Sequence, residues 1–173
     1  AALFQSARFV ADEYLQSFLP VFLKFLEKSS GKSFPIYARH LCEIIKVAGY
    51  QIENYAQKIF QSLELLWHRS YTSEVSMVLC ALITHTKGSC GVVINSILAA
   101  TQILIQNNEE SVKDLFAILR AVSKSSSSHI DTVVFILTDI LTMPSIPLQQ
   151  DLALDTIEYI MACCDCEQSI GAI

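Results

Sequence analysis

Glycine and proline are scarce in this chain, with 5 glycines and 4 prolines among 173 residues. Charged residues make up 17% and hydrophobic residues 52%. So few glycines and prolines argue against a turn-rich β-sandwich, and so little charge beside so much apolar surface argues against disorder. The composition therefore predicts an all-α fold with a well-buried core.

Motifs that carry chemistry are also missing from the sequence. There is no Gly-rich phosphate loop, no Gly-x-Ser-x-Gly turn and no His-Glu-x-x-His helix. His40 and Cys42 stand two apart on an expected helix, where they point in different directions and make a poor nucleophile–base pair. We predict no catalytic residue, no cofactor and no enzymatic activity; an enzyme without a known motif is the third alternative for function.

Cysteine spacing gives no metal site either. Cys163, Cys164 and Cys166 form the densest group of ligand types, but structural zinc needs a second pair, and no histidine follows them. Cys42 and Cys80 lie inside apolar helical patterns, where a free thiol acts as a small hydrophobe. We expect no metal, and a reducing intracellular compartment, either nucleus or cytoplasm.

The longest charge-free run spans residues 88–108, about the length of a membrane-spanning helix. It contains eight side chains of Ser, Thr, Asn or Gln type, and no aromatic belt brackets it. A buried helix is favoured, and a membrane-associated helical domain is kept as the alternative from a different class.

What the sequence does contain is a rhythm of helix-start signals. They recur near Pro35, Ser73, Glu109 and Pro147, and a second series near Ile52, Gly91 and His129 falls about midway. Steps of roughly 36–38 residues lie within the range of two-helix repeats. The pattern predicts nine helices, with Ser17 capping the second and Gly49 just past the third. The expected ranges are 3–16, 17–28, 35–48, 52–69, 73–86, 91–106, 109–124, 129–143 and 147–164.

The two series differ in polarity. The helices expected at 35–48 and 109–124 are amphipathic with one wet face, whereas those at 91–106 and 129–143 are apolar nearly all round. A helix that is apolar on all sides has to be covered on most of them. Stacked helix pairs supply that cover, because the second helix of each pair touches its own partner and both neighbours.

Repeat length, helix alternation and this polarity resemble the HEAT and armadillo class of α-solenoids, over essentially the whole chain. The resemblance implies about four to five antiparallel helix pairs in a single helical-repeat domain, residues 1–173. It also implies protein partners, often in transport, chromosome or assembly complexes. The chain starts at Ala1 without a methionine, and we expect it to be a fragment of a longer protein. The expected function is a scaffold that binds partner peptides or helices.

Charge is unevenly distributed along the chain. All twelve lysines and arginines lie at or before Lys124, and the remainder holds seven acids and no lysine or arginine. Asp151, Asp155 and Glu158 fall at i, i+4 and i+7 on one helix face. They are the candidate binding site for a basic partner segment; the alternative is a solvated face that keeps the array soluble. The net charge of −5 and the absence of a basic stripe in the sequence argue against direct nucleic-acid binding.

Aromatic side chains gather at the start of the chain. These side chains either pack the first helices onto the helix at 35–48 or cover a neighbouring repeat. Because solenoid ends need polar caps, we also expect the isolated chain to self-associate through exposed repeat ends. The group comprises Phe4, Phe9, Tyr14, Phe18, Phe22 and Phe25.

Overall fold

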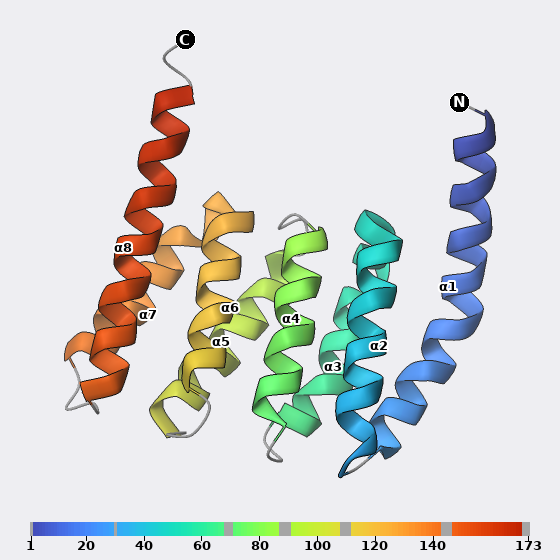
Figure 1. Ribbon diagram of the computed structural model, residues 1–173, viewed down its shortest axis with the longest axis horizontal. Helices are drawn as coiled ribbons and strands as arrows, with labels where there is room; N and C mark the ends of the chain where they lie inside the picture. The colour runs from blue at the N-terminus through green and yellow to red at the C-terminus, as the bar shows by residue number, and fades with distance from the viewer. Residues whose placement is uncertain are drawn as a thin grey trace. The chain divides into compact units, whose positions relative to one another are not determined.

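The computed structural model describes residues 2–29, 31–67, 71–86, 91–107, 112–142 and 147–170, and side chains within them except at 2–12, 65 and 164–170. Throughout these ranges the structure is helical and contains no strand, which confirms the all-α prediction. The helices are α1 (Ala2–Lys28), α2 (Ser33–Ala48), α3 (Ala56–Trp67), α4 (Thr72–Thr86), α5 (Gly91–Asn107), α6 (Val112–Ser125), α7 (Ile130–Thr142) and α8 (Pro147–Ile170), with 3-10 turns at Gly49–Tyr55 and Ser127–His129 (Figure 1).

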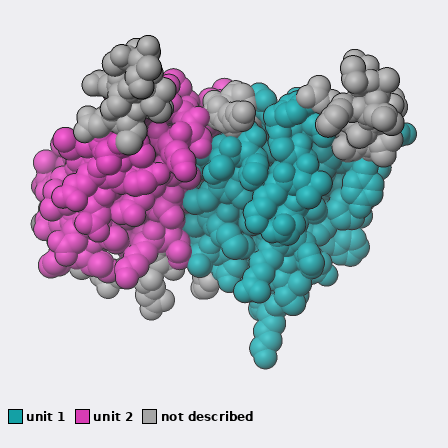
Figure 2. All heavy atoms as spheres, turned by 45° about the horizontal axis from the view of Figure 1, so that its top comes forward, with its two compact units in different colours: residues 1–86 teal, residues 87–173 magenta. Residues whose placement is uncertain are grey.

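The contacts of the chain divide it into two compact units, residues 1–86 and 87–173 (Figure 2). In unit 1, α1 packs against α3, and α2 packs against α4. In unit 2, α6 packs against α8 and against α5, and α7 packs against α8. Each unit thus joins helices that are neighbours or next-but-one in sequence. The prediction of a single domain over 1–173 stays a prediction.

Leucines on one face of α1 account for much of its packing. Leu15, Leu19, Leu23 and Leu26 recur at three- or four-residue steps and are all buried. Near the end of α1, Glu27 Oε1 accepts a hydrogen bond from Ser62 Oγ of α3 at 2.7 Å. Since residues three and four apart share a helix face, this leucine face places the aromatic side chains of α1 on a different face.

Polar contacts in unit 2 join helices about one repeat apart. Gln102 Nε2 of α5 donates to Asp139 Oδ2 of α7 at 2.9 Å, across 37 residues. Gln149 Nε2 of α8 donates to the Ile105 carbonyl oxygen of α5 at 2.9 Å. The hydrophobic pattern alone does not reveal these polar side chains, and they connect α5 to both α7 and α8.

The predicted break between residues 16 and 17 is wrong. α1 is one helix of 27 residues with Pro20 inside it. Ser17 caps no helix, because its Oγ donates back to the carbonyl oxygens of Glu13 and Tyr14, each at 3.1 Å. Pro20 has no N–H for the Gln16 carbonyl, which explains the bend along α1 in Figure 1.

Other helix boundaries were predicted more closely or differ in type. Gly49 ends α2 with φ 57°, and its N–H donates to the Ile45 carbonyl oxygen, as the sequence predicted. The expected helix at 52–69 splits instead into the 3-10 turn Gly49–Tyr55 and helix α3. The prediction that a helix starts near Glu109 falls outside the described residues, and α6 is described from Val112.

The helices that are apolar all round are less covered than expected. On α5, Val92 is 77% exposed and Ile103 is also exposed, while Ile94 and Leu98 are buried. On α7, Phe135 is 66% exposed. The buried residues fall on one side of each helix. These segments therefore contain more apolar residues than the structure buries.

Candidate functional site

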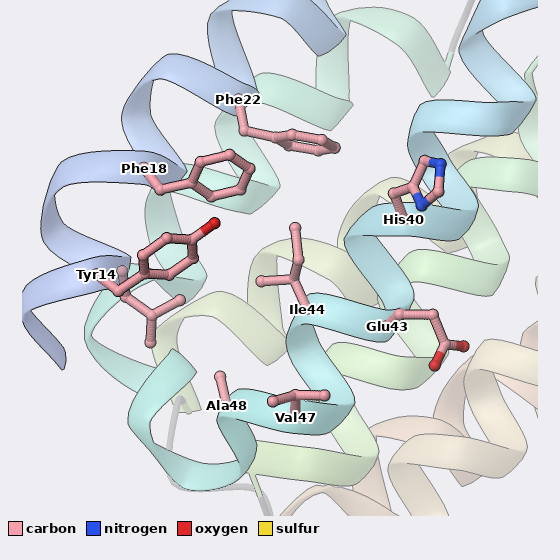
Figure 3. Close-up of a pocket in the computed structure, with 9 residues that line it drawn as sticks. Tyr14, Phe18, Phe22, His40, Glu43, Ile44, Val47 and Ala48 are labelled. Carbon is pink, nitrogen blue, oxygen red and sulfur yellow. The ribbon is translucent and has the colours of Figure 1, made fainter. Parts of the chain in front are cut away.

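An open apolar groove lies between α1 and α2 in unit 1. Its volume is about 440 Å³. Figure 3 shows rings from α1 on one side and aliphatic side chains from α2 on the other. Its lining consists of Tyr14, Leu15, Phe18, Phe22, His40, Glu43, Ile44, Val47 and Ala48.

The α1 wall is a continuous row of aromatic rings. Tyr14 stacks on Phe18 with centroids 5.1 Å apart, and Phe18 lies 5.6 Å from Phe22. Phe22 then meets Tyr37 of α2 edge-on at 6.0 Å. The spacing i, i+4, i+8 puts these rings on one ridge, about two turns or 12 Å long. Offset and edge-on ring contacts stiffen such a ridge.

The α2 wall is aliphatic and open to solvent. Val47 is 87% exposed, the highest value among the exposed large hydrophobic side chains, and Ile44 beside it is half-buried. The Glu43 side chain points away from the aromatic row (Figure 3). The α2 wall of the groove is therefore apolar, and its polar side chains lie at the edge.

The groove is open because α1 and α2 diverge. Figure 1 shows the two helices close together near their connection and farther apart toward the opposite end. α1 commits its leucine face to α3, so its aromatic face has only limited contact with α2. Tyr14 remains 57% exposed as a result.

Basic side chains follow the outer side of α2, between the groove and a second hollow toward α4 that Arg39 and Lys46 line. Lys32, Arg39 and Lys46 recur at seven-residue steps and are all exposed, so they form one short stripe, contrary to the expectation that the chain has none; we call it the basic stripe. Lys46 Nζ pairs with Glu43 Oε1 at 2.7 Å. The hydrogen bond and the charge of Glu43 raise the pKa of Lys46, which keeps this end of the stripe cationic.

Cys42 lies on the next face of α2, lining a second hollow that α2 forms with α4. This hollow has a volume of about 380 Å³ and also touches Met77 and Ala81. Burial raises the pKa of the Cys42 thiol. The thiol is therefore held in its neutral form, which is unreactive as a nucleophile.

The predicted acidic face lies exposed on α8. Asp151, Asp155 and Glu158 are all exposed, and Ala153 and Ile160 on the other side are buried. No described contact tests their predicted role in partner binding. We call these three carboxylates the acidic face.

Burial along α8 does not follow hydrophobicity alone. Met161 is 61% exposed, and Leu148 and Leu154 are exposed as well. Thr156 is fully buried and accepts a hydrogen bond from Arg120 Nε at 3.1 Å.

Two observations bear on the cysteine group that we expect to bind no metal and on the membrane-associated alternative. Among the described side chains, no group of three or more His, Cys, Asp and Glu residues is arranged to hold a metal ion; Cys164 and Cys166 lie outside that set. No described helix combines the length and the hydropathy that crossing a bilayer requires.

The groove itself was not predicted, although one of its walls was visible in the sequence. The row Tyr14, Phe18, Phe22 appeared as an aromatic group that either packs on the helix at 35–48 or covers a neighbour. Phe22 follows the first alternative, since it touches Tyr37, whereas Tyr14 stays exposed and the covering of a neighbouring repeat stays a prediction. Of the remaining members, Phe25 is exposed, and the side chains of Phe4 and Phe9 lie outside the described residues.

In comparisons with known proteins, no family model, no curated protein and no solved structure matches the chain.

Proposed function

We propose that this chain is a helical-repeat scaffold that binds protein partners, and that the α1–α2 groove is its principal docking place. The observation that carries the proposal is the open, aromatic-walled groove, whose apolar side chains have no helix covering them among the described residues. Large apolar hollows with polar margins are typical of binding sites.

Helix packing within each unit supports the repeat architecture. Helices about one repeat apart lie together, as α2 does with α4 and α6 with α8. α2, α4 and α8 begin at Ser33, Thr72 and Pro147, each within two residues of a start expected from the sequence. An α-solenoid of HEAT or armadillo type accounts for both, because in such arrays each helix pair contacts its neighbours in serial order.

The groove suits an amphipathic helix with bulky apolar residues on one side. Its aromatic ridge is about two turns long, which matches anchors at i, i+4 and i+7 of a bound helix. The basic stripe along its α2 margin favours acidic side chains on the flank of that helix.

Free thiols fit a reducing compartment. Cys42 and Cys163 form no disulfide, in keeping with a nuclear or cytoplasmic scaffold. Partners in transport, chromosome or assembly complexes follow from the HEAT and armadillo resemblance.

Selection from a peptide library displayed on phage tests the docking place directly. The immobilised 173-residue chain is the bait, and the variant Tyr14→Ser/Val47→Asn removes the two most exposed apolar side chains of the groove. The control is Phe135→Ser/Val92→Asn, which replaces one aromatic residue and one valine by the same polar residues at exposed positions of unit 2.

We expect enriched peptides to carry apolar anchors at i, i+4 and i+7, and to bind the groove variant about tenfold more weakly than the control. Failure to enrich any peptide, or equal affinity for both variants, contradicts the proposal.

The acidic face of α8 is a second candidate docking place, for a basic segment. Reversal of Asp155 and Glu158 to lysine should abolish salt-sensitive binding of a Lys/Arg-rich peptide. The reversal Asp131→Lys on α7, also at an exposed carboxylate, serves as the control. Unchanged binding after the α8 reversal removes this second site.

A further inference from the structure

We propose that the α1–α2 groove is filled by helix α8 of a second copy of this chain, so that copies associate head to tail. This rests on the proposed function, since it names the helix that the docking groove takes. Three features carry it: the packing position that the groove offers, the apolar ridge of α8, and the opposite charges of the two surfaces.

The packing position is defined by the other unit. In unit 2, α6 lies against both α7 and α8, the two helices that follow it. α1 and α2 are consecutive helices, an odd-numbered one followed by an even-numbered one, as α7 and α8 are. In the described part of unit 1, however, no helix packs against both α1 and α2 in the way that α6 packs against α7 and α8. α8 belongs to the same even-numbered series as α6, which makes a second copy's α8 a suitable helix for that place.

The exposed side of α8 has the apolar residues that the groove requires. Leu154 and Met161 are both exposed and seven residues apart, so they form one ridge of two turns. The half-buried Ile157 lies between them on the same ridge. This length is close to that of the aromatic row Tyr14–Phe18–Phe22, and Tyr14, Leu154 and Met161 all stay exposed within their own units.

Charge favours the same pairing. Asp151 and Glu158 flank the α8 ridge at a seven-residue step, and Asp155 lies between them, all exposed. On α2, beyond the His40 and Glu43 edge of the groove, Lys32 and Arg39 repeat the same step, and Lys46 continues it; Arg39 and Lys46 also line the second hollow toward α4. Arg39 makes no ion pair or hydrogen bond with the described part of the chain, so it is available to a partner carboxylate. Two rows of opposite charge with equal spacing attract the two surfaces to one another and set the position of α8 along the groove.

The contact joins two different surfaces of the chain and is therefore heterologous. Contacts of this kind do not close on themselves unless a rotation completes a ring, so they build chains of copies. Association through α8 and the groove adds helices in the even-numbered series and extends the array beyond one molecule.

Sedimentation velocity at increasing concentrations of the whole 173-residue chain tests the inference. We expect self-association with a dissociation constant on the order of 10–100 μM, weakened about tenfold by Tyr14→Ser/Val47→Asn and unchanged by Phe135→Ser/Val92→Asn. Raising the salt concentration should also weaken it, because both charged rows are exposed.

Charge exchange between two variants makes the test specific. One chain carries Asp151→Lys/Asp155→Lys/Glu158→Lys, and the other carries Lys32→Glu/Arg39→Glu. Each alone should be monomeric because like charges then face each other, whereas an equal mixture should regain association, since each α8 then meets a groove of opposite charge. Circular dichroism confirms that both variants remain helical.

The results that contradict this inference differ from those that contradict the proposed scaffold function. A chain that stays monomeric while selected peptides still bind the groove overturns the inference and leaves the scaffold standing; such peptides with acidic flanks identify a partner protein as the occupant. Self-association that neither set of substitutions alters uses another surface and also overturns it.

Discussion

Arg120 Nε donates a hydrogen bond to Thr156 Oγ1 at 3.1 Å, joining α6 to α8 across 36 residues. The same guanidinium lies 5.8 Å from the centre of the Tyr159 ring. Arg120 therefore spans the interface of two even-numbered helices one repeat apart, at a position where the hydroxyl is fully buried.

Replacing Thr156 with valine keeps the shape of the side chain but removes this acceptor. The free energy of unfolding should fall by about 1–2 kcal/mol, because the Arg120 N–H loses its partner beside a buried site. Urea unfolding monitored by circular dichroism measures the change. Thr156→Ser retains the hydroxyl and should cost less; equal losses for both variants would show that the methyl group matters and the hydrogen bond does not.

Two buried serines should respond in opposite directions to alanine. Ser76 Oγ on α4 is buried and has no hydrogen-bond partner among the described residues, whereas Ser62 Oγ donates to Glu27. Ser76→Ala should raise the free energy of unfolding by about 1 kcal/mol, since it removes an unsatisfied hydroxyl and improves helix propensity. Ser62→Ala should lower it by about 1 kcal/mol. Chemical unfolding of the pair provides the comparison, and a loss on Ser76→Ala would contradict the assignment of an unpaired group.

Pro20 links the stability of α1 to the shape of the groove. Pro20→Ala restores the N–H for the Gln16 carbonyl and should raise the free energy of unfolding by about 1–3 kcal/mol. A straighter α1 also moves the aromatic row relative to α2, so groove-binding peptides should bind more weakly. Thermal unfolding and a peptide titration are measured on the same variant. Gain of stability with unaltered binding would show that the bend does not shape the groove.

The Cys42 thiol gives a pH dependence with a definite sign. Its pKa in the folded chain is raised by burial, by more than the nearby Lys46 charge lowers it. The contribution of this group to stability is therefore complete below the ordinary thiol pKa and declines as the pH rises through it, because only the unfolded thiol ionises readily. Between about pH 8 and about pH 10, unfolding free energy should fall more steeply for the native chain than for Cys42→Ala. Parallel slopes would show that Cys42 does not contribute.

Much of the architecture could be predicted from the sequence because helix signals are local. Gly49 adopts φ 57° at the end of α2, a conformation that glycine accepts without strain, and its position was predicted from the residue type alone. Ser17 and Pro20 led to the wrong prediction of a break in α1. Leucines on both sides of Pro20 are buried along one face of α1, so tertiary burial keeps the helix continuous where local propensity favours a break.

The candidate site was less accessible to sequence reasoning. The aromatic row on α1 was visible, but the second wall depends on the angle between α1 and α2, which no local pattern encodes. The exposure of Met161 likewise depends on which face α8 turns to α6 and α7. Hydrophobic periodicity identifies apolar ridges and leaves open which of them a neighbouring helix covers.

Methyl NMR of Ile44 and Val47 tests the central proposal, that the α1–α2 groove is a helix-docking surface, most directly. The titrant is a synthetic helical peptide of about four turns with leucines at i, i+4 and i+7 and glutamates on its flank; the same peptide broken by two prolines is the control. We predict concentration-dependent shifts of both methyl groups with the helical peptide, and little change at the buried Ile118 and Val122 of unit 2. Unshifted groove methyls at saturating peptide, or equal shifts with the broken peptide, would contradict the account.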